Sequence, residues 1–243
     1  MLDWLLSTID AARPHEIGFA LSWHARLMVL SWGTLTPVAI LIARFYKIMP
    51  NQDWPRELDN TFWWHVHFWG QIASFAIACF ALLLILVSAH NIGAAGRHQF
   101  LGYTVMGLGA LQLLSGFLRG SKGGPTAPHP DGTLRGDHFD MTPRRLAFEL
   151  IHKIVGYTAL GLIIVTIVTG LWAANAPIWM WISIIGWWGF LALFAVRLQT
   201  QRRAYDTYQA IWGDDAELPG NIMPTQGFGM MRPSEVSRFK DKT

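Results

Sequence analysis

The sequence predicts an all-α integral membrane protein, in which a four-helix up-and-down bundle is joined to a fifth transmembrane helix. The first observation is compositional: 52% of the 243 residues are hydrophobic and only 14% are charged, about half the charged share of a soluble domain. This balance excludes a disordered chain, a basic nucleic-acid-binding domain and a coiled coil. The single cysteine, Cys79, excludes a disulfide framework and a cysteine-ligated zinc or iron–sulfur site.

The second observation is the length of the apolar stretches, because an uncharged run of about 20 residues can cross a membrane as a helix. Arg26 interrupts the first stretch near its start, and Pro37 could kink it. The 43 uncharged residues 154–196 exceed one span, and the proline of Asn175-Ala176-Pro177 divides them because it cannot continue a helix. In chain order, the predicted spans are residues 21–43, 63–89, 98–118, 148–173 and 177–196.

The chain divides into four regions around these spans. They are an N-terminal periplasmic or interfacial segment (1–20), the four-helix core (21–173), the fifth helix (174–198) and a basic cytoplasmic tail (199–243). In the first region, Trp4, Leu5, Leu6 and Ile9 could share one face of a short helix that lies on the membrane surface, and a disordered start is the alternative. Residues 197–212 could extend the fifth helix. The tail from Gly213 onward is rich in proline and glycine, and we expect it to lack a packed core of its own.

The distribution of basic residues predicts the orientation of the chain. Of the 19 lysines and arginines, only Arg13, Arg26 and Arg97 fall on the side of the N-terminus. The other 16 fall in the first and third loops, at the helix ends beside them and in the tail. Because basic residues accumulate on the cytoplasmic side, we expect a cell inner membrane protein with a periplasmic N-terminus and a cytoplasmic C-terminus.

The third and fourth spans contain a repeat that begins with a histidine. Residues 98–104 (HQFLGYT) align with residues 152–158 (HKIVGYT), and Gly116 of the third span aligns with Gly170 of the fourth. The two helices cross the membrane in opposite directions, so the repeat is inverted. Small residues at this spacing serve helix packing, but the histidine at the head of both copies indicates a further role.

Each of the first four spans has a histidine about one turn inside its start: His24, His67, His98 and His152. By helix direction, His24 and His98 lie near the outer face, whereas His67 and His152 lie near the inner face. An ionisable residue within a span is costly and usually functional. A lone histidine there is more often a hydrogen-bonded structural residue, but four of them, paired by depth, favour metal ligation from facing helices.

The ligand set favours haem over a free metal ion. Neither a carboxylate nor a thiolate lies at the right depth, since Glu149 is at a helix edge and Cys79 is in mid-membrane. Two histidines alone suit haem iron, and the lack of a C-x-x-C-H motif predicts two non-covalent b-type haems. We therefore pair His24 with His98 and His67 with His152, on helices that are diagonal in the bundle. Gly102 and Gly156, one turn after a histidine, would leave room for the macrocycle.

The core resembles the cytochrome b561 family. The segments that carry the resemblance are HARLM from His24 with Trp32-Gly33, WHVH ending at His67, RHxxxG from Arg97 and HxxxG from His152, within about residues 20–173. The resemblance implies a transmembrane electron carrier with two bis-histidine b haems and these four ligands. Eukaryotic members have six spans; with five, and with the segments 208–213 and 218–221, this chain looks more like a bacterial branch.

Further histidines and cations are candidates for supporting roles. His65 and His67 are about 200° apart around a helix, so only one can face the bundle, and the family register favours His67. His90 is a reserve ligand for the outer haem. We expect His15, His129 and His138 to be solvated loop residues, although the last two could line an entry site over the inner haem. Four cations could pair with haem propionates or simply extend to lipid headgroups: Arg26, Arg97, Arg44 and Lys153.

The function predicted from these observations is transmembrane electron transfer, with exchange of electrons with quinone, quinol or a partner redox protein. No catalytic residue is predicted, the surrounding partner is membrane lipid, and no nucleic acid is involved. A quinone could bind beside Arg26, Arg97 or Lys153. One alternative is a haem-bearing membrane anchor and electron conduit of a larger dehydrogenase complex. A less favoured alternative is a haem-free inverted-repeat transporter, which would need helices broken at mid-membrane.

Overall fold

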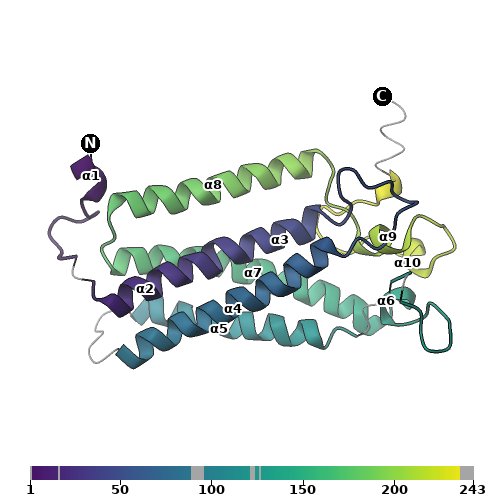
Figure 1. Ribbon diagram of the computed structural model, residues 1–243, viewed down its shortest axis with the longest axis horizontal. Helices are drawn as coiled ribbons and strands as arrows, with labels where there is room; N and C mark the ends of the chain where they lie inside the picture. Colours follow the sequence, from purple (N-terminus) through teal and green to yellow (C-terminus); the bar gives the residue numbers. More distant parts are fainter. Residues whose placement is uncertain (1, 16, 89–95, 121–123, 126, 236–243) are drawn as a thin grey trace. The chain divides into compact units, whose positions relative to one another are not determined.

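The computed structural model describes residues 2–15, 17–88, 96–120, 124–125 and 127–235. These residues form helices, without a β-strand among them (Figure 1). The elements are α1 (Leu2–Leu6), α2 (Phe19–Met28), the π-helical segment η1 (Val29–Leu35), α3 (Thr36–Phe45), α4 (Phe62–Ser88), α5 (Gly96–Phe117), α6 (Asp137–Asp140), α7 (Pro143–Ala173), α8 (Ile178–Thr200), α9 (Thr207–Trp212) and α10 (Pro219–Ile222).

Five helical segments are long and apolar enough to cross a membrane, which confirms the predicted all-α, multi-span class. The first is the continuous run α2–η1–α3 (Phe19–Phe45), and the others are α4, α5, α7 and α8. The helices run beyond the predicted spans, most clearly α7, which begins at Pro143, and α8, which continues to Thr200. Hydropathy marks only the apolar part of a helix, so polar turns at its ends are missed.

Contacts divide the chain into two compact units. The first unit consists of Met1–Val38, Gly70–Leu111 and Gly156–Phe194, and the second of Ala39–Trp69, Gln112–Val155 and Ala195–Thr243. Helices α4, α5, α7 and α8 each contribute residues to both units.

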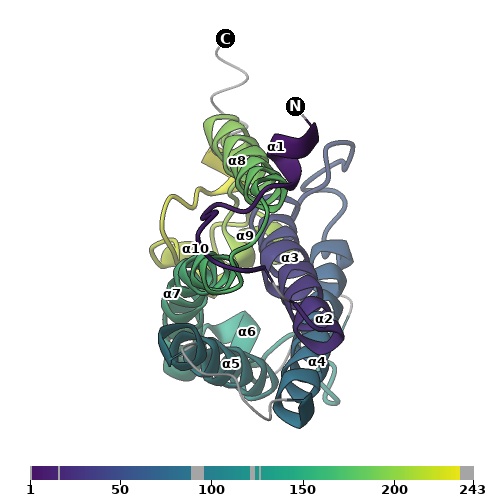
Figure 2. The same cartoon turned by 90° about the vertical axis from the view of Figure 1, so that its left-hand side faces the viewer.

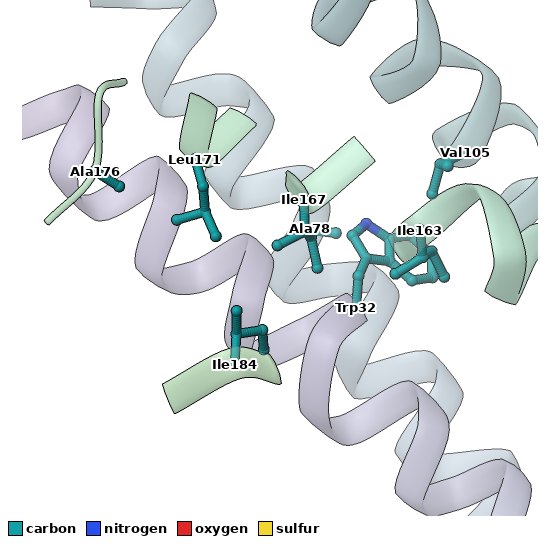
Figure 3. Close-up of a cluster of buried hydrophobic side chains, with 8 residues drawn as sticks. All are labelled: Trp32, Ala78, Val105, Ile163, Ile167, Leu171, Ala176 and Ile184. Carbon is teal, nitrogen blue, oxygen red and sulfur yellow. The ribbon is translucent and has the colours of Figure 1, made fainter. Parts of the chain in front are cut away.

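The core of the first unit is a cluster around Trp32 (Figure 3). Its other buried members are Ala78, Val105, Ile163, Ile167, Leu171, Ala176 and Ile184. The Trp32 ring packs edge-on against Phe75, with ring centroids 6.2 Å apart. A Cβ atom at Gly109 would lie 2.6 Å from the Trp32 ring, so glycine at this position allows the indole to fill the centre of the cluster.

The π-helical segment η1 precedes Pro37, the residue that could have kinked the first span. Proline has no N–H to donate to the carbonyl of Gly33, four residues earlier. That carbonyl accepts hydrogen bonds from the indole N–H groups of Trp187 and Trp188 on α8, at 3.2 and 3.1 Å. The buried Ser74 hydroxyl donates to the Ser31 carbonyl at 2.8 Å. Side chains from two neighbouring helices therefore satisfy carbonyls of the irregular segment.

The turn between α7 and α8 lies at the predicted break and also anchors the N-terminal segment. Asn175 adopts a positive φ of 47° and is buried. Its side-chain amide donates to the carbonyls of Asp10 and Arg13 at 2.9 and 2.7 Å, and its Oδ1 accepts from the Asp10 N–H at 3.1 Å. The expected short N-terminal helix is present as α1, and its apolar side chains Leu2, Trp4 and Leu6 are exposed.

In the second unit, the tail differs from the expectation in two ways. Helix α8 does not extend to Trp212, because Arg202 has a φ of 57° and Asp206 starts the separate helix α9 by accepting hydrogen bonds from two N–H groups. The tail is also packed. Buried Met141, Tyr208, Ile211 and Trp212 form a cluster, against which Trp63, Phe139, Leu146, Leu218 and Met223 pack. Apolar residues of the third loop and the tail thus share one core, which neither segment could form alone.

Candidate functional site

The first unit brings together His24 from α2 and His98 from α5. Their ring centroids are 6.3 Å apart and their planes are nearly perpendicular, at 88°. Seen from the end of the helices in Figure 2, α2 lies beside α4 and α5 lies beside α7. Each histidine is bonded to the neighbouring helix: His24 Nδ1 lies 2.9 Å from the Ala81 carbonyl, and His98 Nδ1 lies 3.0 Å from the Thr166 carbonyl.

These carbonyl contacts determine which nitrogen of each ring is available to a ligand. A carbonyl can only accept, so Nδ1 carries the hydrogen in both rings, and Nε2 keeps its lone pair. Among the described residues, Nε2 of neither His24 nor His98 makes a hydrogen bond. Metal-binding histidines usually donate their other N–H to a carbonyl or carboxylate in this way, which fixes the tautomer and the ring orientation.

A cavity of about 1250 Å³ surrounds this pair within the first unit. Its walls are mainly apolar residues of α2, α5, α7 and α8, and it also includes Arg26 and Arg97. Gly102 lines the cavity, and a Cβ atom there would meet no other atom within 4 Å. At Gly170, by contrast, a Cβ atom would lie 2.8 Å from Cε1 of His98. Gly102 thus borders open space, whereas Gly170 makes room for the imidazole itself.

The second unit brings together His67 from α4 and His152 from α7. Their ring centroids are 6.2 Å apart at an interplanar angle of 80°. His152 Nδ1 lies 3.4 Å from the Ser115 hydroxyl, and the Phe148 ring stacks on the imidazole at 5.0 Å. The His67 imidazole is buried and interacts with the backbone of Ala39.

The two pairs share one spacing, which would suit two imidazoles bound to one metal ion. At the usual metal–nitrogen distance of about 2 Å, two imidazoles on opposite sides of an ion have ring centroids roughly 6 Å apart. The described residues contain no group of three or more histidine, cysteine or carboxylate side chains that could hold a metal ion. Each pair therefore offers two protein ligands, the number that a haem iron takes when its porphyrin supplies four.

The other histidines that the structure describes are not brought to these pairs. His65 is exposed, and its ring contacts Trp64 of its own helix at 4.9 Å. His15 is bonded to the Ala174 carbonyl, and His129 lies 3.4 Å from Asp131 on an exposed loop. His90 lies outside the described residues.

His138 was expected to be solvated, and this expectation is wrong. Its side chain is 2% exposed, because the short helix α6 packs it against the rings of Tyr208 and Trp212, each at 6.3 Å. Burial, followed by the positive charge of Arg145, lowers the pKa of His138 to about 3, so its imidazole is neutral at physiological pH. The aromatic spacing of Tyr208 and Trp212 was the one signal in the sequence that could have indicated a buried partner for this loop.

The four cations proposed to flank the sites have different surroundings. Arg26 and Arg97 are exposed residues that line the large cavity. Lys153 donates to Glu149 Oε2 and to the Gln226 carbonyl, at 2.7 and 2.8 Å. Arg44 donates to the Gln199 side chain and to the carbonyl of Phe228, at 3.0 and 2.8 Å. Lys153 and Arg44 therefore hold residues of the C-terminal tail.

Several residues that support the histidines were not singled out from the sequence. The repeat could have indicated two of them, because Gln112 and Thr166 each follow their repeat histidine by 14 residues. The Thr166 carbonyl accepts from His98, and the Gln112 side chain donates to the His152 carbonyl at 2.9 Å. Gly156 lies in α7 one turn after His152, as expected from its position in the sequence.

Comparison with known proteins gives relatives of one kind. The chain is similar to a cytochrome b561, DM13 and DOMON domain-containing protein of Arabidopsis thaliana, 26% identical over 167 residues (69% of this chain and 16% of that protein). It is also similar to ferric-chelate reductase 1 of Bos taurus, 34% identical over 108 residues (42% and 18%), and of Mus musculus, 30% identical over 139 residues (56% and 20%). No family model and no solved structure matches the chain.

The homologues are thus eukaryotic cytochrome b561 domain proteins and ferric-chelate reductases of low identity, and the matched region spans a fifth or less of their length. Together with the five apolar helices, they support a multi-pass membrane protein that is similar to cytochrome b561 domain proteins.

Proposed function

We propose that this chain, whose homologues are cytochrome b561 domain proteins, carries electrons across a membrane through two bis-histidine b haems. His24 and His98 would hold one haem, and His67 and His152 the other. The observation that carries the proposal is the pairing of these four side chains at two nearly equal centroid distances, 6.3 and 6.2 Å. Each pair joins helices that are not consecutive in the chain. The same pairing is predicted from the sequence, because helix direction places the two histidines of a pair at the same depth in the membrane.

The haems, when bound, would supply one-electron redox chemistry. The chain's own contribution is orientation and shielding. The carbonyls of Ala81 and Thr166 fix the imidazoles of one pair, and Ser115 and Phe148 hold His152 of the other. Because two histidines would fill both axial positions, we expect simple electron transfer rather than oxygen chemistry at iron.

The proposed exchange partners are quinone or quinol from the lipid phase and a redox protein from the water phase. The large cavity supports a lipid-soluble partner, because its apolar wall includes α8 and its cations Arg26 and Arg97 are exposed. A ferric chelate is a further acceptor to be tested, since several relatives are ferric-chelate reductases.

We further propose a bacterial inner membrane location, a periplasmic N-terminus and a cytoplasmic C-terminus. The support is the uneven distribution of lysine and arginine, of which 16 of 19 fall on one side of the predicted spans. The five-span arrangement and the segments 208–213 and 218–221 support the bacterial branch of the family.

The decisive experiment is a dithionite-reduced minus oxidised absorption spectrum of the purified protein, with haem quantified per chain. We expect two low-spin b haems. His24→Ala and His98→Ala should each remove one and the same haem, whereas His67→Ala and His152→Ala should remove the other. His65→Ala is the matched control and should keep both. A colourless protein, purified from cells supplied with haem, would overturn the proposal.

A second candidate function is the haem-bearing membrane subunit of a larger complex. It is favoured by the relatives, because the matched region is only 16–20% of their length and one of them is named for two further domains. Co-purification of a second redox subunit under mild detergent would support this candidate. A haem-free transporter is disfavoured, since the described parts of α4, α5, α7 and α8 run without a break.

A further inference from the structure

A second, much smaller cavity lies in the second unit, where α4 begins, α5 has just ended and α7 begins. Its volume is about 20 Å³, and its lining includes Arg119, His138 and Arg145. Arg119 and Arg145 were assigned no role above, and His138 was considered only as a residue of an entry site. A cavity of this size accommodates a water molecule or one small polar group, and a larger organic anion would not fit.

The cavity is surrounded by buried hydrogen-bonding groups that have no partner among the described residues. Both ring nitrogens of His138 are unpaired, as are Nε and Nη1 of Arg145. Both side chains are buried, at 2% and 4% exposure. Buried polar atoms of native proteins are nearly always paired. The two Arg145 nitrogens and one nitrogen of the neutral His138 ring are donors, so their lack of a partner indicates a missing acceptor.

The charges around the cavity favour an anion as that acceptor. Arg145 Nη2 donates to Glu149 Oε1 at 2.7 Å, and Lys153 donates to the other oxygen of the same carboxylate, so Glu149 is shared between two cations. Arg119 adds a third cation. Asp59 also lines the cavity and makes an interaction of its own. Of the charged residues that line the cavity, two are arginines and one, Asp59, is acidic.

Each arginine lies over an aromatic ring near the His67–His152 pair. The Arg145 guanidinium lies over the Phe148 ring at 5.2 Å, and that ring stacks on His152 at 5.0 Å. The Arg119 guanidinium lies over the Trp64 ring at 5.6 Å, and Trp64 precedes His67 by one helical turn. The cavity thus borders the site in which the second haem is proposed to bind.

We propose that this cavity is a carboxylate-binding site in which Arg119, Arg145 and His138 receive a propionate of the haem held by His67 and His152. The small volume favours a carboxylate carried on an arm of a neighbouring group over a free organic anion. A guanidinium group matches the donor geometry that a carboxylate prefers. Lys153 and Arg44, the cations first considered for this role, are bonded to the tail instead. The inference rests on the proposed function.

The test isolates the second site in a His98→Ala background, in which one haem per chain should remain. Haem-free protein is titrated with haem and with haem dimethyl ester, which lacks free carboxylates. We expect haem to bind roughly tenfold more tightly than the ester, or more, because charge-assisted hydrogen bonds are lost with the ester. Arg119→Gln, Arg145→Gln and His138→Gln should each reduce this preference several-fold.

Two matched control variants carry the same kinds of substitution at residues outside the cavity. Arg135→Gln and His129→Gln alter exposed residues of the third loop, and both should keep the full preference for haem over its ester. Circular dichroism of each haem-free variant checks that it is folded, and the conservative Arg145→Lys variant should restore part of the preference if Arg145→Gln is poorly folded.

The outcomes separate this inference from the function on which it rests. Loss of the preference in the cavity variants alone supports the propionate site. Equal binding of haem and ester by the parent overturns the site while leaving the haem protein intact, and would make the cavity a water site. Added formate could also slow the dissociation of haem dimethyl ester from the parent protein but not from Arg145→Gln. That result would support the proposal, because it shows that the cavity binds a carboxylate. No haem binding at all overturns both proposals.

Discussion

At the scale of single residues, the positions of the paired histidines depend on neighbouring residues, which leave space for the imidazole rings or accept their hydrogen bonds. Gly170 is the clearest case, because the His98 ring occupies the space in which a side chain would lie. The aligned Gly116 borders open space instead. The repeat therefore predicts a glycine at both positions, but only at Gly170 does the structure give it a steric reason.

Gly170→Ala should disturb the His24–His98 site selectively. A Cβ atom would lie 2.8 Å from His98 Cε1, so the imidazole must move. We expect one of the two haems to be lost or to show a changed low-spin signal in electron paramagnetic resonance. Gly107→Ala is the control, because a Cβ atom there meets nothing within 4 Å. An unchanged spectrum in Gly170→Ala would show that this contact does not position the ligand.

Lys47 provides a pH-dependent prediction. Burial, and then the positive charge of Lys153, lower its pKa from 10.5 to about 7. Lys47 donates to the Tyr205 carbonyl at 2.9 Å. Between pH 7 and 10.5 the unfolded chain binds a proton that the folded chain does not, so the stability of the fold should rise with pH in this window, by up to about 1.4 kcal/mol per pH unit.

The measurement is thermal unfolding in detergent from pH 7 to pH 10. The parent should gain stability across this range, and Lys47→Met should gain less, because the titrating group is gone. Parallel curves for the two proteins would exclude Lys47 as the source of the dependence.

At the scale of elements, the five spans follow from hydropathy, but the irregular segment η1 does not. Pro37 indicated a disturbance in the first span, and the structure shows how the neighbouring helices accommodate it. The Gly33 carbonyl accepts two indole N–H groups from α8, and the Ser31 carbonyl accepts the Ser74 hydroxyl. The helix therefore stays continuous instead of breaking.

Removal of both indole donors should destabilise the protein. Trp187→Phe and Trp188→Phe should each have a small effect, under about 1 kcal/mol, since the other indole still satisfies the Gly33 carbonyl. The double variant leaves this carbonyl without either donor and should lower the free energy of unfolding by about 1–3 kcal/mol. Denaturation in mixed micelles measures the effect, and additive single effects would contradict the shared acceptor.

At the scale of the whole molecule, the distribution of basic residues predicts the orientation of the chain. We expect green fluorescent protein to be fluorescent when fused after the C-terminus or inserted at Gly132 of the third loop, and alkaline phosphatase to be inactive at both places. The reason is the concentration of lysine and arginine in these regions. Active phosphatase at either position would reverse the predicted topology.

The sequence by itself determined the number of spans, the break at Asn175 and the four histidines at the helix starts. Each of these features can be read along the chain without knowledge of the fold. They are the length of an apolar stretch, the position of a proline and the position of a histidine within a span. It also indicated the pairing of His24 with His98 and of His67 with His152, because helix direction converts position in the chain into depth.

Only the tertiary structure decided what surrounds each histidine. The acceptors at Ala81 and Thr166 are backbone carbonyls, which every residue has, so no residue type marks them in advance. His138 reads as a loop residue until α9, some 70 positions later, is packed against it. The burial of a group depends on segments distant in the chain, and it is this burial that leaves the nitrogens of His138 and Arg145 without partners.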